Sequence, residues 1–192
     1  MYFCTMRPQK ILEADMISGL TKVFRDKGYE GTSLNDLAGA TGLKKASLYH
    51  RFPNGKQEMA ASVLNTIDQW VDDHIFFPLT DENRPAKLRV KDALKNIEIL
   101  YDNGKETCVL RAFSMHGGLS LFEHQIKSGM DKWINAFNAL GISLKLSSTA
   151  SQENAIQTLI ELQGSLIVTK GLADTNIFKK TLKNIEKRYS KE

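Results

Sequence analysis

Residues 32–52, TSLNDLAGATGLKKASLYHRF, have the pattern of two short helices joined by a sharp turn. Ser33 is a favourable N-cap residue, and Asp36 follows three positions later as the acidic partner of a capping box. The leucines in each half recur at helical spacing and give each helix an apolar face. Gly42 stands where the chain must turn with a positive φ, a conformation that only glycine adopts without steric penalty. This stretch therefore predicts a helix-turn-helix.

The second half of this stretch carries side chains that suit DNA. Leu43 and Leu48 continue the apolar face, so the polar residues around them point mostly outward. Cations, hydroxyls and aromatic rings are groups that bind phosphates and base edges. A helical hairpin in any all-α protein can share the leucines and the glycine, so a ligand-binding or scaffolding protein with a purely structural hairpin is the alternative. The outward residues are Lys44, Lys45, Ser47, Tyr49, His50 and Arg51.

Most of the excess positive charge of the chain lies near this helix-turn-helix. The chain has 192 residues, with 26 Lys and Arg against 22 Asp and Glu, and a formal net charge of +4. Residues 1–60 hold nine basic and six acidic residues, a net of +3, and the remainder holds seventeen and sixteen, a net of +1. A mildly basic chain permits nucleic acid as a partner without requiring it. The location of the charge favours a small basic DNA-binding domain on a near-neutral body.

The cysteines, histidines and apolar runs disfavour secreted, membrane and metal-dependent proteins. Cys4 and Cys108 are too few for a disulfide framework, which favours a reducing cytoplasm. No apolar run approaches the roughly 20 residues that a membrane-spanning helix needs. His116, Glu123 and His124 match no strong zinc pattern, and we find no P-loop, dinucleotide fingerprint or nucleophile elbow. We therefore expect no metal, no cofactor and no enzyme activity.

Helical periodicity runs through nearly the whole chain and predicts an all-α fold with about nine helices. We expect a three-helix, helix-turn-helix DNA-binding domain over residues 1–55 and a helical ligand-binding and dimerisation domain over residues 56–192. A long helix should begin at Lys56 and end before Pro78, because proline disfavours helix in the residue before it. Its first N–H groups and the Lys56 ammonium would suit a DNA phosphate, with an ordinary solvated lysine as the alternative. The Tyr49 hydroxyl would likewise contact a phosphate, or its ring would pack against the first helix.

Two glycines on one stripe of the penultimate predicted helix, over residues 152–172, indicate a close helix contact. Glycine in a helix interior costs about 1 kcal/mol relative to alanine, so a pair on one face suggests that another backbone approaches there. Two helices from each of two subunits would form an interface around a twofold axis, as a helix-turn-helix that reads a palindrome requires. Packing within one subunit is the alternative. The predicted interface residues are Ile160, Gly164, Ile167, Gly171, Phe178, Leu182 and Ile185.

The middle helices are rich in aromatic and sulfur-containing residues, which form either a plain core or the lining of an apolar cavity. Helical proteins commonly bind small molecules between their helices. Composition alone does not separate these alternatives. The candidate pocket residues are Trp70, Tyr101, Phe113, His116, Phe122, Trp133, Phe137 and Gln163.

The chain from Ile11 to about Leu64 resembles the TetR/AcrR family of transcriptional regulators. The resemblance rests on FRDKGYEGTSLNDLA at residues 24–38 and on TGLKKASLYHRF at residues 41–52. FPNGKQEM at residues 52–59 is similar to a motif of the LmrA/YxaF-like branch, one residue longer than the family's common F-x-x-K-E-x-L. Farther along, LQGSLIVTKGLAD and TCVL resemble the penultimate helix and the short middle helix of that branch.

The resemblance implies a homodimer that places one helix-turn-helix per subunit in successive major grooves of a palindromic DNA operator. It also implies a cavity in the carboxy-terminal domain for a small lipophilic or aromatic ligand. Binding of this ligand would change the separation of the two helix-turn-helix units and release a repressor from DNA. An activator, or a DNA binder that has no effector, is the alternative within the same class.

The resemblance also assigns individual residues to the DNA contact. The family often has Ser or Thr as a helix cap at the position of Lys44. The recognition helix therefore starts differently here, or Lys44 itself reads a base. By position, Lys44, Lys45 and Ser47 would approach bases, whereas Thr32, Tyr49, His50 and Lys56 would hold phosphates, and Ser33 completes the predicted DNA-binding set.

Overall fold

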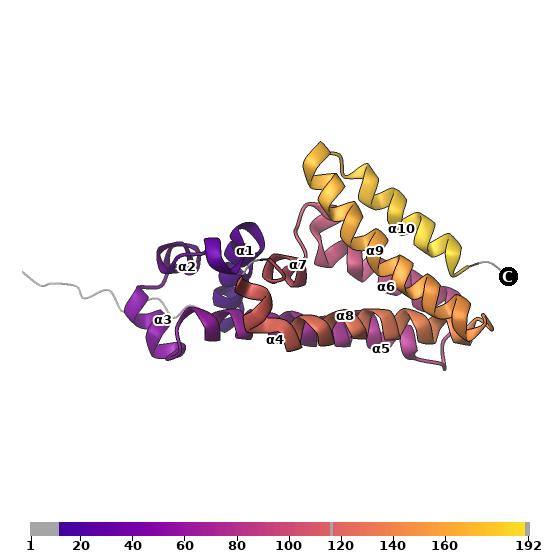
Figure 1. The fold of residues 1–192 in the computed structure, drawn as a ribbon, viewed down its shortest axis with the longest axis horizontal. Coiled ribbons are helices and arrows are strands. Elements are labelled where there is room, and N and C mark those ends of the chain that lie inside the picture. Colours follow the sequence, from indigo (N-terminus) through magenta and orange to yellow (C-terminus); the bar gives the residue numbers. More distant parts are fainter. Residues whose placement is uncertain (1–11, 116, 191–192) are drawn as a thin grey trace, which may run out of the picture.

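The chain is helical, with no β-strand among residues 12–115 and 117–190, which the computed structural model describes (Figure 1). Counted with α4, η1 and α5 as one continuous helix and without the three-residue η2, these residues form nine helices, which confirms the predicted all-α fold. In the same part of the chain, no helix has the length and apolar character needed to cross a membrane. The elements are α1 (Glu13–Gly31), α2 (Leu34–Thr41), α3 (Lys45–Arg51), α4 (Lys56–Val71), the π-helical η1 (Asp72–Phe76), α5 (Phe77–Thr80), α6 (Ala86–Leu100), the short η2 (Asp102–Gly104), α7 (Val109–Phe113), α8 (Gly117–Ser143), α9 (Ser148–Leu172) and α10 (Asn176–Arg188).

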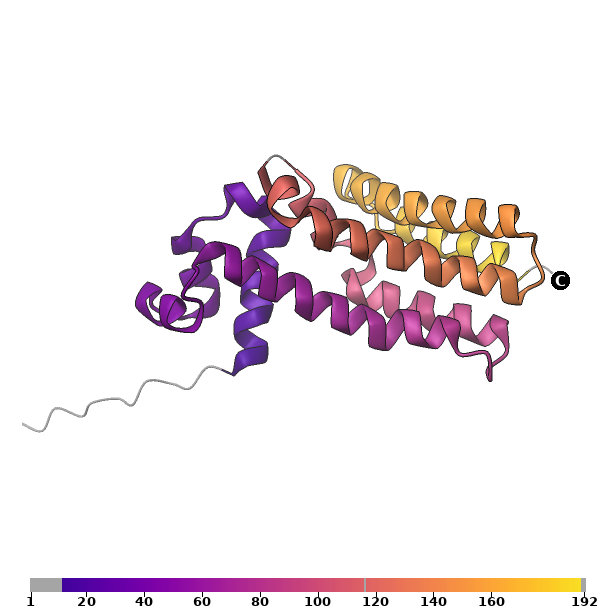
Figure 2. The same cartoon turned by 60° about the horizontal axis from the view of Figure 1, so that its bottom comes forward.

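The three amino-terminal helices gather at one end of an elongated molecule (Figure 1). α4 begins among them and continues through η1 and α5 into the body, where η1 and α5 pack on α6 (Figure 2). α8 packs along α9, and α10 packs on α9. The helix-turn-helix therefore projects from a helical body, and α4 belongs to both parts.

Two hydrophobic clusters form the core of the described residues, and one of them crosses from the helix-turn-helix into the body. The amino-terminal cluster joins side chains of α1 to α4 with Val109 and Phe113 of α7 and with Phe122 and Ile126 of α8. The body cluster joins η1, α5 and α6 with α8, α9 and α10. α7 and the first turns of α8 thus pack with helices that precede them by about forty residues or more of chain.

The helix that begins at Lys56 does not end before Pro78, so this prediction is wrong. It passes through the π-helical η1 and continues as α5 beyond the proline. Proline has no N–H, so the carbonyl of His74, four residues earlier, lacks its usual backbone donor. The side-chain amide of Asn96 on α6 donates to that carbonyl at 2.6 Å. A neighbouring helix thus supplies the hydrogen bond that the proline removes.

Arg89 is a buried cation whose hydrogen-bond partners lie at two helix ends. The residue is only 4% exposed. Its Nη1 donates to the Leu79 carbonyl at 2.8 Å, and its Nη2 donates to Ser143 Oγ at 2.7 Å. Both partners are at the C-terminal ends of their helices, where the helix dipole is negative and stabilises a cation. Arg89 therefore joins α5, α6 and α8 at the far end of the body.

α1 and α2 cross closely at Gly19. A Cβ atom on Gly19 would lie 2.7 Å from the carbonyl oxygen of Ala40 and 3.1 Å from its carbonyl carbon. Backbone atoms can make room for such a methyl group only if the whole helix moves. Gly39 lies on α2 in an open position, with no atom within 4 Å of the place of its Cβ. The two helical glycines therefore differ in the space around them.

We expect Gly19→Ala to lower the free energy of unfolding by about 1–3 kcal/mol, because α1 and α2 must separate to admit the methyl group. Gly39→Ala is the matched control and should raise it by about 0.4–1 kcal/mol, since it reduces the freedom of the unfolded chain without a clash. Urea unfolding followed by circular dichroism measures both differences. Equal unfolding free energies for the two variants would contradict the close crossing.

Candidate nucleic-acid interface

The helix-turn-helix begins and turns as the sequence predicts. The Asp36 N–H donates to Ser33 Oγ at 3.2 Å, and the Ser33 N–H donates to Asp36 Oδ2 at 2.9 Å, which confirms the capping box. Hydrogen bonds from Lys27 and Ser33 hold the pKa of Asp36 well below its ordinary value, so this carboxylate stays ionised at the N-terminal end of α2. Gly42 ends α2 with a φ of 66°, which confirms the glycine turn.

α3 presents a polar face that we call the recognition face. Leu48 is completely buried in the amino-terminal cluster, so the opposite side of this short helix faces solvent. Lys44 is the N-cap residue, but its side chain makes no capping hydrogen bond and is exposed. The ring of Tyr49 is 46% exposed and lies beside Gly55, whose Cβ would meet the ring at 3.3 Å. The recognition face consists of Lys44, Lys45, Ser47, Tyr49 and His50.

Thr32 and Lys56, which the resemblance places at phosphates, make contacts within the protomer. Thr32 is 2% exposed, and its hydroxyl donates to the Gly28 carbonyl at 2.6 Å. The Lys56 ammonium donates to the carbonyls of Tyr29 and Thr32 at 3.0 and 3.1 Å. It also lies 4.4 Å from the centroid of the Tyr29 ring, a cation–π distance. Lys56 therefore ties the start of α4 to the connection between α1 and α2.

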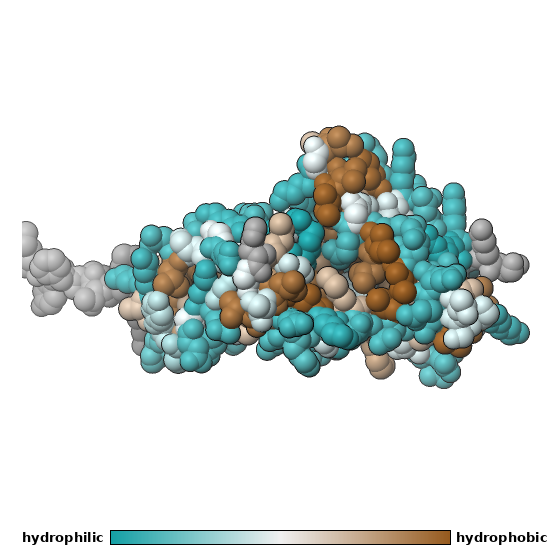
Figure 3. Space-filling model, viewed as in Figure 1, coloured by the Kyte–Doolittle hydropathy of each residue, from teal (hydrophilic) through white to brown (hydrophobic). Residues whose placement is uncertain are grey.

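α9 carries a row of apolar side chains on its outer face, visible as brown patches along the helix in Figure 3. Ile160, Ile167 and Leu172 are 58%, 51% and 68% exposed, respectively. Gly164 and Gly171 have no atom within 4 Å of the position of a Cβ. We call these five residues the α9 face. The glycines are therefore not packed against another helix of the same protomer.

The α10 residues of the predicted interface have a different environment. Phe178 and Ile185 are completely buried, and Leu182 is 7% exposed. All three belong to the body cluster of the same protomer. Their assignment to an interface between subunits is therefore wrong, because the apolar face of α10 is already covered by its own chain.

An apolar cavity of about 220 Å³ lies between α4, α7 and α8. Of the predicted pocket residues, Tyr101 and Trp133 line it, and Trp70 lines a neighbouring open groove along α1 and α4. Burial raises the pKa of Tyr101 well above its ordinary value, so the phenol stays neutral. In the described ranges, no three His, Cys, Asp or Glu side chains gather to hold a metal ion.

The other predicted pocket residues do not line this cavity. Phe113 and Phe122 lie in the amino-terminal cluster, and Phe137 lies in the body cluster. Gln163 is absent from the lining, although its Oε1 is buried without a hydrogen-bond partner among the described residues. His116, like Cys4, lies outside the described residues. The four described residues of this group thus lie in different parts of the fold, although the sequence pattern predicted that they line one pocket.

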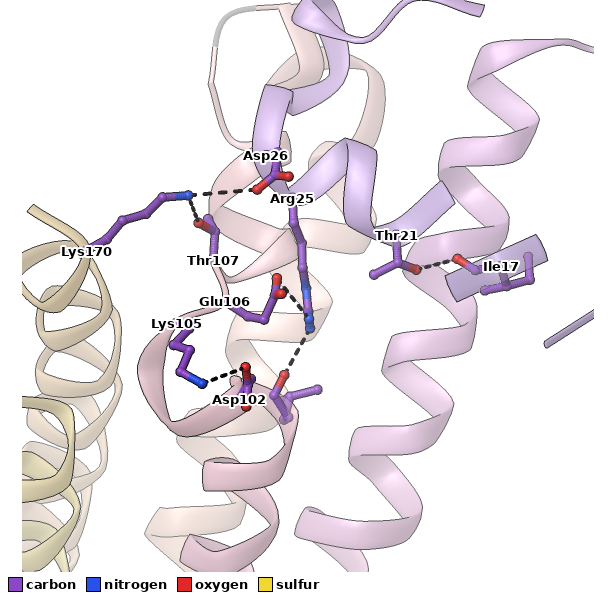
Figure 4. Close-up of polar contacts among 10 residues, drawn as sticks. Ile17, Thr21, Arg25, Asp26, Asp102, Lys105, Glu106, Thr107 and Lys170 are labelled. Atoms are coloured by element: carbon purple, nitrogen blue, oxygen red, sulfur yellow. Dashed lines mark hydrogen bonds and ion pairs between the residues drawn. The ribbon is translucent and has the colours of Figure 1, made fainter. Parts of the chain in front are cut away.

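Four polar contacts join α1 to the body, and those of Arg25 and Asp26 are drawn in Figure 4. The Arg25 guanidinium donates from Nη2 to the Leu100 carbonyl at 3.2 Å, and its Nη1 lies 3.7 Å from a carboxylate oxygen of Glu106. An exposed ion pair at 3.9 Å joins Asp26 of α1 to Lys170 of α9. The backbone N–H of Gly117 donates to Glu30 Oε1 at 2.9 Å. Arg25 lines the cavity although nothing in its local sequence pattern marks it as a cavity residue.

Comparison with known proteins assigns the amino-terminal helices to a family. A family model described as bacterial regulatory proteins, tetR family, matches residues 17–63. The HTH-type transcriptional regulator LmrA of Bacillus subtilis (strain 168) is 36% identical over 56 residues, which are 29% of this chain and 30% of LmrA. IcaR of Staphylococcus epidermidis, a negative transcriptional regulator of the biofilm operon icaADBC, is 35% identical over 57 residues, 30% of this chain and 31% of IcaR. The chain thus matches less than a third of the length of these two relatives.

Longer matches include the body. The uncharacterized HTH-type transcriptional regulator YxaF of Bacillus subtilis (strain 168) is 24% identical over 153 residues, which cover 78% of this chain and 80% of YxaF. The crystal structure of a TetR transcriptional regulator from Legionella pneumophila has a TM-score of 0.78 at 17% identity and covers 95% of this chain and 98% of that chain. At this identity the likeness shows the fold. Residues 17–63 thus match the tetR family model, and nearly the whole chain has the fold of a TetR transcriptional regulator.

Proposed function

We propose that the chain is a homodimeric transcriptional repressor that binds a palindromic DNA operator and is released by a small lipophilic or aromatic ligand. Residues 1–55 form the DNA-binding part in this proposal, and residues 56–192 bind the ligand and the second subunit. The observation that carries the proposal is the recognition face, a set of polar side chains on α3 that are exposed apart from the half-buried Ser47. α3 follows the capped helix α2 and its glycine turn. The description of the relative IcaR as a negative regulator supports repression.

The recognition face has the chemistry and position of a helix that reads the major groove. In helix-turn-helix proteins, residues near the N-terminal end of the second helix contact base edges. Lys44 and Lys45 are at that end of α3 and are exposed. Farther along α3, Tyr49 and His50 carry exposed polar atoms that suit phosphates. We therefore assign base contacts to the lysines and phosphate contacts to Tyr49 and His50.

The α9 face supports a homodimer. Exposed isoleucines and leucine beside two uncovered glycines form a surface on which a second helix can approach closely. A twofold interface brings the same patch of each subunit together, so one self-complementary face is sufficient. We assign Ile160, Gly164, Ile167 and Gly171 to this interface and exclude the α10 residues, which are buried within the protomer.

Release by a ligand requires that the ligand bind one arrangement of the two helix-turn-helix units better than another. α4 is the element that supports such coupling. Its first residue, Lys56, contacts the connection between α1 and α2, and its later residues Leu64 and Val71 line the cavity. A ligand that moved the cavity end of α4 would therefore move a helix that is tied to the DNA-binding part.

We expect Lys45→Ala and Tyr49→Ala to weaken binding to DNA taken from upstream of the chain's own gene. Lys45 is assigned to a base, so its removal should lower the affinity for this DNA more than the affinity for unrelated DNA. Removal of the Tyr49 phosphate contact should weaken binding to all sequences and, because tyrosine is neutral, leave the salt slope of binding unchanged. Lys91→Ala on α6 is the matched control, an exposed lysine of the body, and should leave the affinity unchanged. Gel shifts at several salt concentrations measure these effects. Unchanged affinity in both variants would favour the alternative of a helical ligand-binding protein whose helix-turn-helix is only structural.

We expect Lys56→Met to act on stability, in contrast to the recognition face. Removal of the charged donor leaves the Tyr29 and Thr32 carbonyls without this partner and should lower the free energy of unfolding by about 1–3 kcal/mol. Urea unfolding measures this loss, with Lys91→Met as the control. The salt slope of DNA binding, measured where the variant is folded, should equal that of the parent. A slope reduced by about 1 would instead assign Lys56 to a phosphate.

We expect Ile167→Glu to convert the dimer into a monomer, because a carboxylate would be buried against its symmetry mate on the α9 face. Leu88→Glu is the matched control, since Leu88 on α6 is 49% exposed and Ile167 is 51% exposed. Sedimentation velocity measures the mass of each variant in solution. If the dimer survives Ile167→Glu and dissociates only when another surface is changed, the interface does not lie on α9.

A further inference from the structure

A nearly buried cation lies in the wall of the apolar cavity. The Arg25 side chain is 11% exposed and extends from α1 to the end of α6 (Figure 4). Arg25, Ile67 and Leu100 line both the cavity and the open groove beside it, so these three residues separate the two spaces. The first helix of the DNA-binding part therefore contributes directly to the cavity of the body.

Arg25 has fewer hydrogen bonds than a guanidinium in this position can make. A guanidinium has five N–H donors. Nη2 donates to the Leu100 carbonyl, whereas the 3.7 Å between Nη1 and Glu106 is longer than a hydrogen bond. Nε is buried and has no hydrogen-bond partner among residues 12–115 and 117–190. Buried charges in proteins are normally paired and hydrogen-bonded, so the site has donors available for an anion.

The remainder of the cavity is mostly apolar. Leu64, Val71, Val109 and Trp133 are buried residues that contribute to its lining. An apolar chain or ring would bury its surface against them, while a charged end would lie at Arg25. The other ionisable groups of the lining are Asp68, which pairs with Lys132 at 2.7 Å, Cys108, His124 and the neutral Tyr101. Arg25 is thus the one Lys or Arg among the described residues of this lining, and its partner Glu106 lies at 3.7 Å without a hydrogen bond.

We propose that the effector is an apolar carboxylic acid, whose carboxylate pairs with Arg25 while its chain or ring fills the cavity against Trp133. This inference rests on the proposed function, because it names the chemical class of the effector and adds a residue of α1 to its site. A carboxylate matches the planar guanidinium with two parallel hydrogen bonds. A dianion such as a phosphate monoester would leave one charge without a partner in an apolar space.

Binding of the acid exchanges one set of Arg25 contacts for another. Glu106 is 34% exposed, so its carboxylate can return to water when the ligand displaces it from Arg25. The contact between Arg25 and the Leu100 carbonyl joins α1 to the end of α6, and the ligand competes for the same guanidinium. The acid therefore favours an arrangement in which α1 is released from α6, which is the differential binding that an effector needs.

Isothermal titration calorimetry of the full chain tests the proposal with two matched pairs of probes. Octanoate and octanol represent an aliphatic effector, and phenylbutyrate and phenylbutanol represent an aromatic one. The parent should bind at least one acid about tenfold or more tightly than its alcohol, the effect of one charge-assisted contact. Arg25→Gln should abolish this preference, and Arg25→Lys should retain part of it. Arg84→Gln, at an exposed arginine that pairs with Asp92, is the matched control.

Glu106→Gln keeps the test decisive if Arg25→Gln folds poorly. Removal of the competing carboxylate should strengthen acid binding several-fold and leave alcohol binding unchanged, a gain that loss of structure does not produce. The proposal is overturned if neither acid binds the parent, if acid and alcohol bind equally, or if the preference survives in Arg25→Gln. A gel shift of the ligand-free chain is read separately. DNA binding without acid binding overturns only the effector class, whereas acid binding through Arg25 without DNA binding supports this site and contradicts the repressor.

Discussion

Four aromatic rings from α1, α7 and α8 hold the DNA-binding helices on the body. The ring centroids of Phe24 and Phe113, of Phe113 and Phe122, and of Tyr29 and Phe122 are each 5.2 Å apart. Aromatic pairs at such distances contribute about 0.5–1.5 kcal/mol each beyond the area that they bury. Because α1 also packs on α2 and α4, its apolar residues serve the helix-turn-helix and the body together. A shift of α7 or of the start of α8 would therefore displace α1.

Tyr29 links this aromatic cluster to the start of α4. Its ring packs on Phe122 on one side and lies under the Lys56 ammonium on the other, while its carbonyl accepts a hydrogen bond from the same ammonium. Gly118, in the first turn of α8, has room only for a hydrogen at this junction, because a Cβ there would lie 2.6 Å from the Phe113 carbonyl oxygen. The first turns of α4 and α8, the two long helices that run into the body, thus meet at one residue of α1 (Figure 2).

Local chemistry predicted the parts of this structure that depend on neighbours in sequence. The cap at Ser33 and the turn at Gly42 follow from residues within four positions of each other. Contacts made across the fold were not predictable in this way. Asn96 donates to the carbonyl of His74, twenty-two positions away, which Pro78 leaves without a backbone donor, and Arg25 reaches the cavity from α1. The pattern of apolar residues likewise did not distinguish core from cavity. A phenylalanine such as Phe113 fits the helical pattern equally well in both, and the structure places it in the core.

The size of the Arg25 contact is sufficient for the switch that we propose. A hydrogen bond to a charged group contributes about 1.5–3 kcal/mol, and allosteric coupling energies are commonly about 1–3 kcal/mol. One such contact corresponds to about a tenfold change in affinity for each subunit. An operator held by both subunits of a dimer would experience the product of two such changes, about a hundredfold. Because Arg25 belongs to α1, this energy acts on the DNA-binding part directly, and the ligand needs no long chain of intermediate movements.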